Sequence, residues 1–241
     1  MEVSPYGLES LWSQGDFVTK GVALLLLAMS IASWYVIVTK ALQLFQYRSS
    51  ANAAGHEFWD ATNLKDGLAT LGKGNPFAAI AAAGVTAMEH HEAHKGHLHD
   101  ELSVSDWITL SLRQAIDETQ ARLQTGMAVL ASVGSTAPFV GLFGTVWGIY
   151  HALVAIGTSG QASIDKVAGP VGEALIMTAL GLAVAIPATF GYNALVRGNK
   201  AVIAKMNKFG FDLHALFVTG ARAKDGASPA SGSRLVAVGG K

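Results

Sequence analysis

The chain has 241 residues, of which 51% are hydrophobic and only 14% charged, and its formal net charge is zero. A composition this apolar is unusual for a soluble domain and indicates a membrane protein. The neutral charge argues against nucleic acid as a partner, and the absence of cysteine excludes a disulfide framework and thiolate chemistry.

The N-terminal part predicts a surface segment followed by a membrane span. In residues 1–16, Leu8, Leu11 and Trp12 share one helical face, which favours a periplasmic amphipathic segment on the membrane surface. A loosely ordered terminus is the alternative. Residues 17–40 are the expected first span, because most of this stretch is uncharged and apolar and about 20 such residues cross the hydrocarbon core as a helix.

Residues 41–128 are expected to form a cytoplasmic helical region. Asn75 and Pro76 suit the cap and the first position of one helix. A second helix is expected to begin at about 103–105, and its apolar residues recur at helical spacing. No strong breaker follows, so the sequence predicts one continuous helix from there to Ile156.

Residues 129–156 and 164–196 are the expected second and third spans, joined by a periplasmic link at 157–163. Residues 197–220 continue the third span as a cytoplasmic helix. The tail 221–241 is rich in Gly, Ala and Ser and is expected to be disordered. The predicted fold is an all-α membrane protein with three transmembrane helices, in which spans 2 and 3 extend into a cytoplasmic helical domain.

Span 2 carries small residues at helical spacing, which let helix backbones approach closely in lipid. These residues are expected to pack mainly within one subunit, and self-association of the chain is the other use open to them. Pro138 in span 2 and Pro187 in span 3 each remove a backbone hydrogen bond, so a kink is expected at both. The packing positions are Gly134, Ala137, Gly141, Thr145, Gly148 and Ala152, with Gly144 and Gly148 forming a GxxxG pair.

Basic residues near the ends of the spans predict the orientation of the chain. Lys40 and Arg48 follow span 1, and Arg197 and Lys200 follow span 3, whereas the link between spans 2 and 3 is flanked only by Lys166. The N-terminus and this link are therefore expected outside, and the C-terminus is expected in the cytoplasm.

Glu173 stands at the head of a charge-free run that lasts to Val196, and an ionisable residue among membrane spans is a candidate functional residue. If the third helix begins at Pro170, Glu173 lies in the first turn, where it favours the helix dipole and needs no function. If the helix begins near Ser163, Pro170 is internal and Glu173 lies about 15 Å along the helix, inside the membrane. The sequence leaves both readings open.

The run EHHEAHKGHLHD, residues 89–100, holds five of the eight histidines. The spacing of His90 and His94 suits two imidazoles on one metal ion if the segment is helical. A solvated loop between helices, broken at Gly96, explains the composition equally simply. No metal site is therefore predicted.

Four stretches of the chain form long motifs around the predicted spans. At these motifs the chain resembles the proton-channel family of ExbB, TolQ and the flagellar stator subunit MotA, and its ExbB branch most closely. The resemblance covers roughly residues 23–217. The motifs are SIASWYVIVTK (30–40), APFVGLFGTVWGIYHA (137–152), VAGPVGEALIMTALGLAVAIPA (167–188) and NALVRGNK (193–200).

The resemblance implies an inner-membrane protein that assembles as a homopentamer, with the transmembrane helices of ExbD in its pore. The complex would power TonB, which drives uptake of iron-siderophores and cobalamin. Glu173, Thr145 and Thr178 match the residues that line the pore in this family, where an Asp of ExbD carries the proton. Five residues turn an ideal helix by about 140°, so Glu173 and Thr178 cannot point along one radius. No cofactor, metal ion or enzymatic activity is implied, and membrane lipids are the remaining partner.

Two other functions stay open on the sequence alone. A TolQ-type subunit of the Tol-Pal system, which energises constriction of the outer membrane, has closely similar spans. A structural membrane assembly protein without ion flow is the alternative from a different class. It predicts that Glu173→Gln is tolerated.

Overall fold

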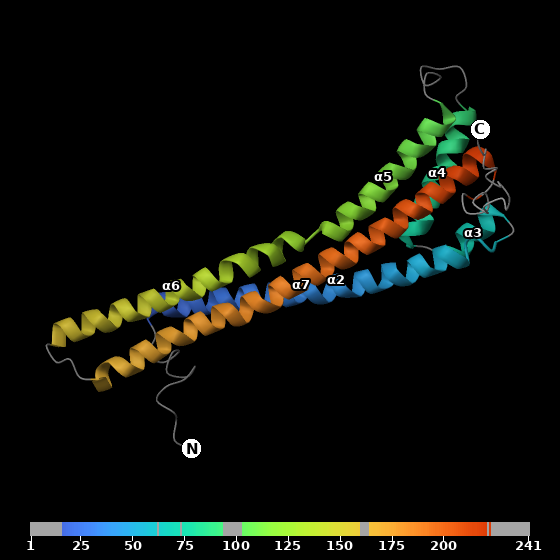
Figure 1. The fold of residues 1–241 in the computed structure, drawn as a ribbon. Helices are drawn as coiled ribbons and strands as arrows, with labels where there is room; N and C mark the ends of the chain where they lie inside the picture. Colours follow the sequence, from blue (N-terminus) through green and yellow to red (C-terminus); the bar gives the residue numbers. More distant parts are fainter. Residues whose placement is uncertain are drawn as a thin grey trace, which may run out of the picture. The chain divides into compact units, whose positions relative to one another are not determined.

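The computed structural model describes residues 16–61, 63–72, 74–93, 103–159, 164–220 and 222. The regular secondary structure of these residues is α-helical, which confirms the predicted all-α fold (Figure 1). The helices are α2 (Phe17–His56), α3 (Leu64–Leu71), α4 (Pro76–Ala93), α5 (Val104–Gln124), α6 (Met127–Ser159) and α7 (Ile164–Thr219).

The chain divides into two compact units. The first unit comprises Met1–Gln46 and Ala121–Ala201, and the second comprises Tyr47–Gln120 and Val202–Lys241. Helices α2 and α7 contribute residues to both units. Three predicted segments lie wholly or largely outside the described residues: the N-terminal amphipathic segment, the histidine run after residue 93, and the tail apart from Arg222.

The core of the first unit is built from α2, α6 and α7, which lie side by side in Figure 1. Much of it consists of small or medium side chains, so the helix backbones approach each other closely. The buried members are Val22 and Leu26 from α2, Val133 and Ala137 from α6, and Met177, Ala185 and Ala188 from α7.

Large apolar side chains cover the outside of the same unit. Soluble proteins rarely expose contiguous apolar surface of this kind, whereas a helix in lipid presents apolar side chains outward and satisfies its backbone internally. The exposed residues include Leu24, Leu27, Ile31, Phe139, Phe143, Val146, Leu153, Leu175, Leu182, Ile186 and Phe190.

In the described part of the chain, three stretches are helical, long and apolar enough to cross a membrane. Their bounds are Phe17–His56, Val104–Thr158 and Gly169–Thr219. The number agrees with the three spans that the sequence predicts. The second stretch takes in both α5 and α6. Its membrane-crossing part falls in α6, because α5 carries several charged side chains whereas α6 contains no Asp, Glu, Lys or Arg.

The predicted continuous helix from about residue 105 to Ile156 is wrong. The helix is interrupted at Thr125–Gly126, between α5 and α6. Gly126 has φ = 82°, a left-handed conformation that glycine adopts at little cost and that commonly ends helices. One glycine among the many of this region gives no local sign of a break.

Side chains from two other helices stabilise this break. A helix end leaves its last four carbonyls without backbone donors. Lys40 Nζ donates to the Arg122 carbonyl at 2.8 Å, and Asn199 Nδ2 donates to the Leu123 carbonyl at 3.3 Å. The end of α5 is therefore fixed by α2 and α7.

Helix α2 runs unbroken past the expected end of span 1 to His56, so the helical region expected after residue 40 begins within the same helix. Helix α7 continues to Thr219, as the spacing of its apolar residues predicts. The helices that extend beyond the apolar spans are thus α2 and α7, because α6 is separated from α5. Hydrophobic periodicity marks where a span is apolar, but it does not mark where a helix stops.

The second unit has an ordinary apolar core. Its helix starts agree with the sequence: Asn75 Oδ1 accepts from the Phe77 amide at the start of α4, and Ser103 Oγ accepts from the Asp106 amide at the start of α5. The predicted apolar faces are buried. Core residues include Phe58, Phe77, Ile80, Ala81, Ile108, Leu112, Ile116, Val202, Met206, Phe209 and Leu213.

A buried acidic residue, Asp212, lies in this second unit and is paired. Arg222 Nε lies 3.4 Å from Asp212 Oδ2, and the same guanidinium lies 4.3 Å from the centre of the Trp59 ring. Arginine is suited to both contacts, because its planar cation binds carboxylates and stacks on aromatic faces. The pair offsets the cost of burying the carboxylate and holds the chain just after α7.

Candidate functional site

Two threonines bring their hydroxyls together between α6 and α7. Thr145 is 8% exposed, and its Oγ1 lies within hydrogen-bond distance of Thr178 Oγ1. The same oxygen lies 3.1 Å from the Gly141 carbonyl, one turn back on α6, and 3.1 Å from the Ala174 carbonyl on α7. The pair therefore links the two helices by polar contacts inside an apolar unit.

The hydroxyl pair has more acceptors than hydrogens. A threonine hydroxyl carries one donor hydrogen and two acceptor lone pairs, so Thr145 can donate to only one of the three oxygens around it. Each arrangement of hydrogens satisfies the buried oxygen differently. Rotation of a hydroxyl about its C–O bond exchanges these arrangements. The donor hydrogen can therefore change acceptors without movement of either backbone.

Helix α7 begins at Ile164 with Pro170 inside it, so the reading that places Glu173 in the first turn is wrong. Nine residues of helix precede Glu173, which corresponds to roughly 13 Å. The helix-dipole explanation of this carboxylate, which depends on the first turn, therefore does not apply. Glu173 is half-buried.

Glu173 lines a cavity of ≈ 310 Å³ within the first unit. Helices α6 and α7 and the residues that begin α2 form its walls. Since a water molecule occupies about 30 Å³ of liquid, several fit in a space of this size. The polar lining groups are Asp16, Thr19, Trp147, His151 and Glu173.

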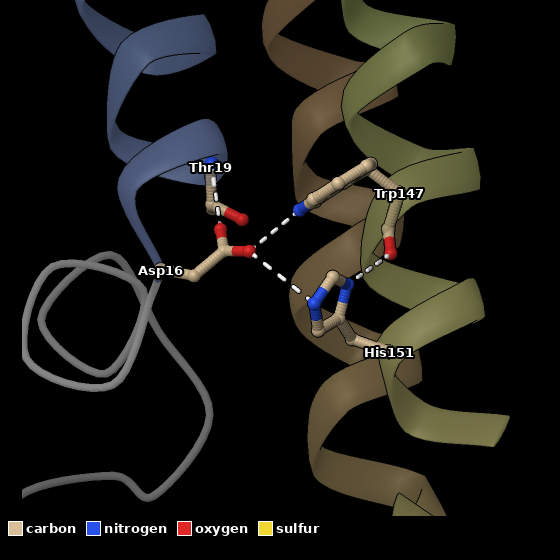
Figure 2. Close-up of polar contacts among 4 residues, drawn as sticks. All are labelled: Asp16, Thr19, Trp147 and His151. Atoms are coloured by element: carbon tan, nitrogen blue, oxygen red, sulfur yellow. Dashed lines mark hydrogen bonds and ion pairs between the residues drawn. The ribbon is translucent and has the colours of Figure 1, made fainter. Parts of the chain in front are cut away.

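Across the cavity from α7, Asp16 makes contacts to two helices (Figure 2). Its Oδ1 accepts from the Thr19 amide at 2.8 Å and thus caps α2. Its Oδ2 accepts from the Trp147 indole Nε1 at 2.6 Å and lies 3.7 Å from His151 Nε2. The start of α2 is thereby joined to α6.

The pKa of Asp16 reflects these contacts. Burial raises the pKa, but hydrogen bonds from the Thr19 amide and the Trp147 indole, with the nearby His151 imidazole, outweigh it and hold the pKa of Asp16 below its ordinary value. Asp16 is therefore a carboxylate at neutral pH.

Glycines on α6 and α7 set the distance between the threonines. A Cβ placed on Gly141 would lie 2.6 Å from the Met177 carbonyl oxygen, and one on Gly181 would lie 2.7 Å from the Ala137 carbonyl oxygen. On Gly148 a Cβ would lie 3.0 Å from Ala174 Cβ. The stripe of span 2 therefore packs against α7 of the same chain.

Of the three remaining predicted positions, Gly144 also lies in this packing. A Cβ on Gly144 would lie 3.1 Å from Met177 Cβ and 3.2 Å from a Val22 methyl group, so Gly144 faces both α7 and α2. Pro138 lies inside α6 and Pro187 inside α7, and both helices continue through them. The expected kinks at the two prolines stay predictions.

The Asp16 cluster is the part of the site that sequence analysis missed. The sequence places Asp16 in a surface segment and Trp147 in a span motif, without connecting them. One local signal is present, because Asp is a preferred residue immediately before a helix. The partners of Asp16 include Trp147, 131 residues further along the chain, a separation that no local pattern bridges.

The metal hypothesis gains no support from the described residues. They contain no group of three or more His, Asp or Glu side chains placed to hold a metal ion. His94 and the later histidines of the run lie outside these residues.

Fold and site together define a class. The three long apolar helices, their outward-facing large apolar side chains and the small polar centre between α6 and α7 are those of a multi-pass α-helical membrane protein. The model of one family, the MotA/TolQ/ExbB proton channel family, matches residues 74–208.

Relatives of the chain include proteins named ExbB and TolQ. It is 48% identical over 219 residues to the biopolymer transport protein ExbB of Xanthomonas campestris pv. campestris, covering 88% of this chain and 87% of the relative. It is 39% identical over 209 residues to ExbB of Neisseria meningitidis, and the match covers 86% of this chain and 95% of the relative. The Tol-Pal system protein TolQ of Pseudomonas aeruginosa is 32% identical over 212 residues, and the match covers 86% of this chain and 90% of the relative. The chain belongs to the MotA/TolQ/ExbB proton channel family.

Proposed function

We propose that the chain is the ExbB-type proton-channel subunit of an inner-membrane energy transducer. It would assemble as a homopentamer around the transmembrane helices of ExbD and couple the proton-motive force to TonB. Transport of iron-siderophores and cobalamin across the outer membrane would follow. Two relatives named ExbB, at 48% and 39% identity, are more similar to the chain than the TolQ relative at 32%, which supports this branch of the family. The ExbB of Pseudomonas putida is 30% identical.

The observation that carries the proposal is the hydroxyl pair of Thr145 and Thr178. Polar groups between apolar helices are costly unless they are hydrogen-bonded, and this pair is hydrogen-bonded between α6 and α7 with exchangeable hydrogen positions. Thr145 is buried, whereas Thr178 is half-buried. In this proposal Thr178 reaches the proton path and Thr145 orients its hydroxyl.

Glu173 has a separate role in the proposal. The proton-carrying carboxylate is an Asp of ExbD, and Glu173 shapes the electric field and the water structure around it. Glu173 and Thr178 face different directions, since Thr178 contacts α6 and Glu173 lines the cavity beside Asp16. The two residues would thus flank the path from different sides, in one subunit or in neighbouring subunits.

The test is siderophore-dependent growth under iron limitation, in a strain that lacks its own ExbB and expresses this chain with the cognate ExbD. The wild type should restore growth. Glu173→Ala should reduce growth to the level of the empty vector at equal abundance and with an intact oligomer. The control is Glu118→Ala, which removes an exposed carboxylate in the second unit and should grow as the wild type does.

Each other outcome points to a different function. If Glu173→Ala and Glu173→Gln both restore growth, the carboxylate has no functional role and the structural assembly protein is favoured. If the wild type fails but restores outer-membrane integrity in a strain lacking TolQ, the chain is a TolQ-type subunit. The similarity to the Pseudomonas aeruginosa TolQ over 86% of this chain makes this the second candidate.

A further inference from the structure

The cavity that Glu173 lines has a second charged wall, formed by Asp16 and His151. Neither residue has a part in the proposed proton path described above. The side chains of Asp16 and His151 are 37% and 51% exposed, so both have surface outside the cavity as well as within it. A titratable group placed in this way can exchange protons with bulk water and with water inside the cavity.

The surroundings of His151 are made of hydrogen-bond acceptors. Its Nδ1 lies 3.3 Å from the Trp147 carbonyl oxygen, and its Nε2 lies 3.7 Å from Asp16 Oδ2. A neutral imidazole carries one N–H and can donate to only one of them. The imidazolium can donate to the Trp147 carbonyl and at the same time form an ion pair with Asp16.

Asp16 is held in place to act as the counter-ion. The Thr19 amide binds one carboxylate oxygen and the Trp147 indole binds the other, which turns Oδ2 toward His151 (Figure 2). The lowered pKa of Asp16 keeps it ionised over the range in which an imidazole titrates. The position of the negative charge therefore does not depend on whether His151 is protonated.

We propose that His151, positioned by Asp16, is the proton-loading residue at the mouth of the cavity that leads to Glu173. This inference rests on the proposed function and adds to it the residue that takes protons from water. Histidine is suited to the task because its charge changes near physiological pH. The half-exposed ring lines the cavity from α6, whereas Glu173 lines the same space from α7.

The proton balance of the step is simple. A hydronium ion gives its proton to Nε2 of His151: an N–H bond forms, an O–H bond breaks, and water is released. The imidazolium later gives the same proton to a cavity water, which becomes hydronium, and the proton passes through the water beside Glu173 toward the proton-carrying Asp of ExbD. Nε2 regains its lone pair, and no oxidant, reductant or cofactor takes part.

Other groups also lie near the His151 ring. On α6, the Tyr150 ring lies 5.5 Å and the Trp147 ring 4.8 Å from the His151 ring. From the start of α2 the facing group is Asp16, and from α7 the ionisable group in the cavity is Glu173.

The first test measures proton flux into liposomes that hold the full complex with ExbD. His151→Ala should lower the flux several-fold at about pH 8, where protons are scarce, and much less at about pH 6. Added imidazole should restore the flux of His151→Ala and leave that of Glu173→Ala unchanged. His214→Ala, a histidine in the second unit, is the matched control and should follow the wild-type pH profile.

The second test does not depend on flux. Trp147 contacts both Asp16 and His151, so its fluorescence should change when His151 gains a proton. The difference between the wild-type and His151→Gln titrations should show one step between about pH 5 and pH 8. Asp16→Asn should change that difference titration, because the carboxylate that contacts both Trp147 and His151 is lost.

The results separate this inference from the proposed function. A wild-type pH profile in His151→Ala, without an effect of imidazole, overturns the loading role while Glu173 keeps its own. A difference titration without a step overturns it independently of any flux. If neither the wild type nor any variant conducts, the proposed function fails instead, and the fluorescence titration then decides on His151 alone.

Discussion

Gly141→Ala tests whether the close approach of α6 and α7 sets the geometry of the hydroxyl pair. The new Cβ would lie 2.6 Å from the Met177 carbonyl oxygen, where ordinary contact begins at 3.4 Å, a shortfall of about 0.8 Å. It would also lie 3.0 Å from Gly181 Cα. Both obstacles are backbone atoms that cannot rotate away, so the helices must separate. Overpacking of this kind costs about 1–3 kcal/mol.

A matched substitution on the same helix isolates the clash. A Cβ on Gly157 would meet nothing within 4 Å. Replacing a helical glycine by alanine stabilises a helix by roughly 0.5–1 kcal/mol through backbone entropy, and Gly157→Ala should show this gain alone. Gly141→Ala combines the same gain with the clash, so its net effect should be a loss of up to about 2 kcal/mol.

The measurement is thermal unfolding of the purified protein in lipid nanodiscs. The readout is the fraction of protein that stays monodisperse after heating. Gly141→Ala should unfold below the wild type and Gly157→Ala at or above it. Growth in the iron-limitation assay should fall for Gly141→Ala, because separation of the helices pulls Thr145 away from Thr178. Equal stability of the two variants would refute the argument that backbone contact limits the distance between α6 and α7.

Three further predictions follow from the same unit. Gly126→Ala should lower stability by about 1–2 kcal/mol in thermal unfolding, because φ is 82° there. Gly126→Asn should lose less stability. Unchanged stability in both variants would contradict a left-handed conformation at the interruption between α5 and α6. Asn199→Ala should lower stability by about 1–3 kcal/mol by leaving the Leu123 carbonyl without this donor, with wild-type behaviour arguing against that contact. The pKa of Asp16 is lowered in the folded state, so its stabilising contribution is present above about pH 4 and lost as the pH falls further. Asp16→Asn should remove that acid dependence from unfolding curves measured between about pH 3 and pH 7, and an unchanged curve would contradict the assignment.

Much of the fold could be predicted because it depends on short-range patterns. Runs of apolar residues mark the three spans, since each helix must present apolar side chains to lipid along its length. Asn75 before Pro76 marks the start of α4 by local hydrogen bonding. The site was partly predictable for the same reason: Glu173 is conspicuous as a carboxylate in an apolar run.

The reading of Glu173 needed a decision that the sequence did not contain. Both Pro170 and the residues before it can begin a helix, and local propensities differ by too little to choose between them. The structure starts α7 at Ile164, which removes the first-turn explanation and makes the carboxylate a lining residue of a cavity. Where a helix begins is decided by the packing of the whole element, and packing is not a local property.

The sequence by itself determined the three apolar spans, the apolar faces and the family motifs, because each of these depends on residues that lie close together in the chain. Composition follows directly from the sequence. Only the tertiary structure decided three features: the helix is interrupted at Gly126, Gly141 packs against α7 of the same chain, and Asp16 contacts Trp147 and His151. Each of these depends on contacts between residues far apart in the chain. Such contacts form only when whole helices pack, and the free energy of packing is shared over many side chains rather than carried by any local motif.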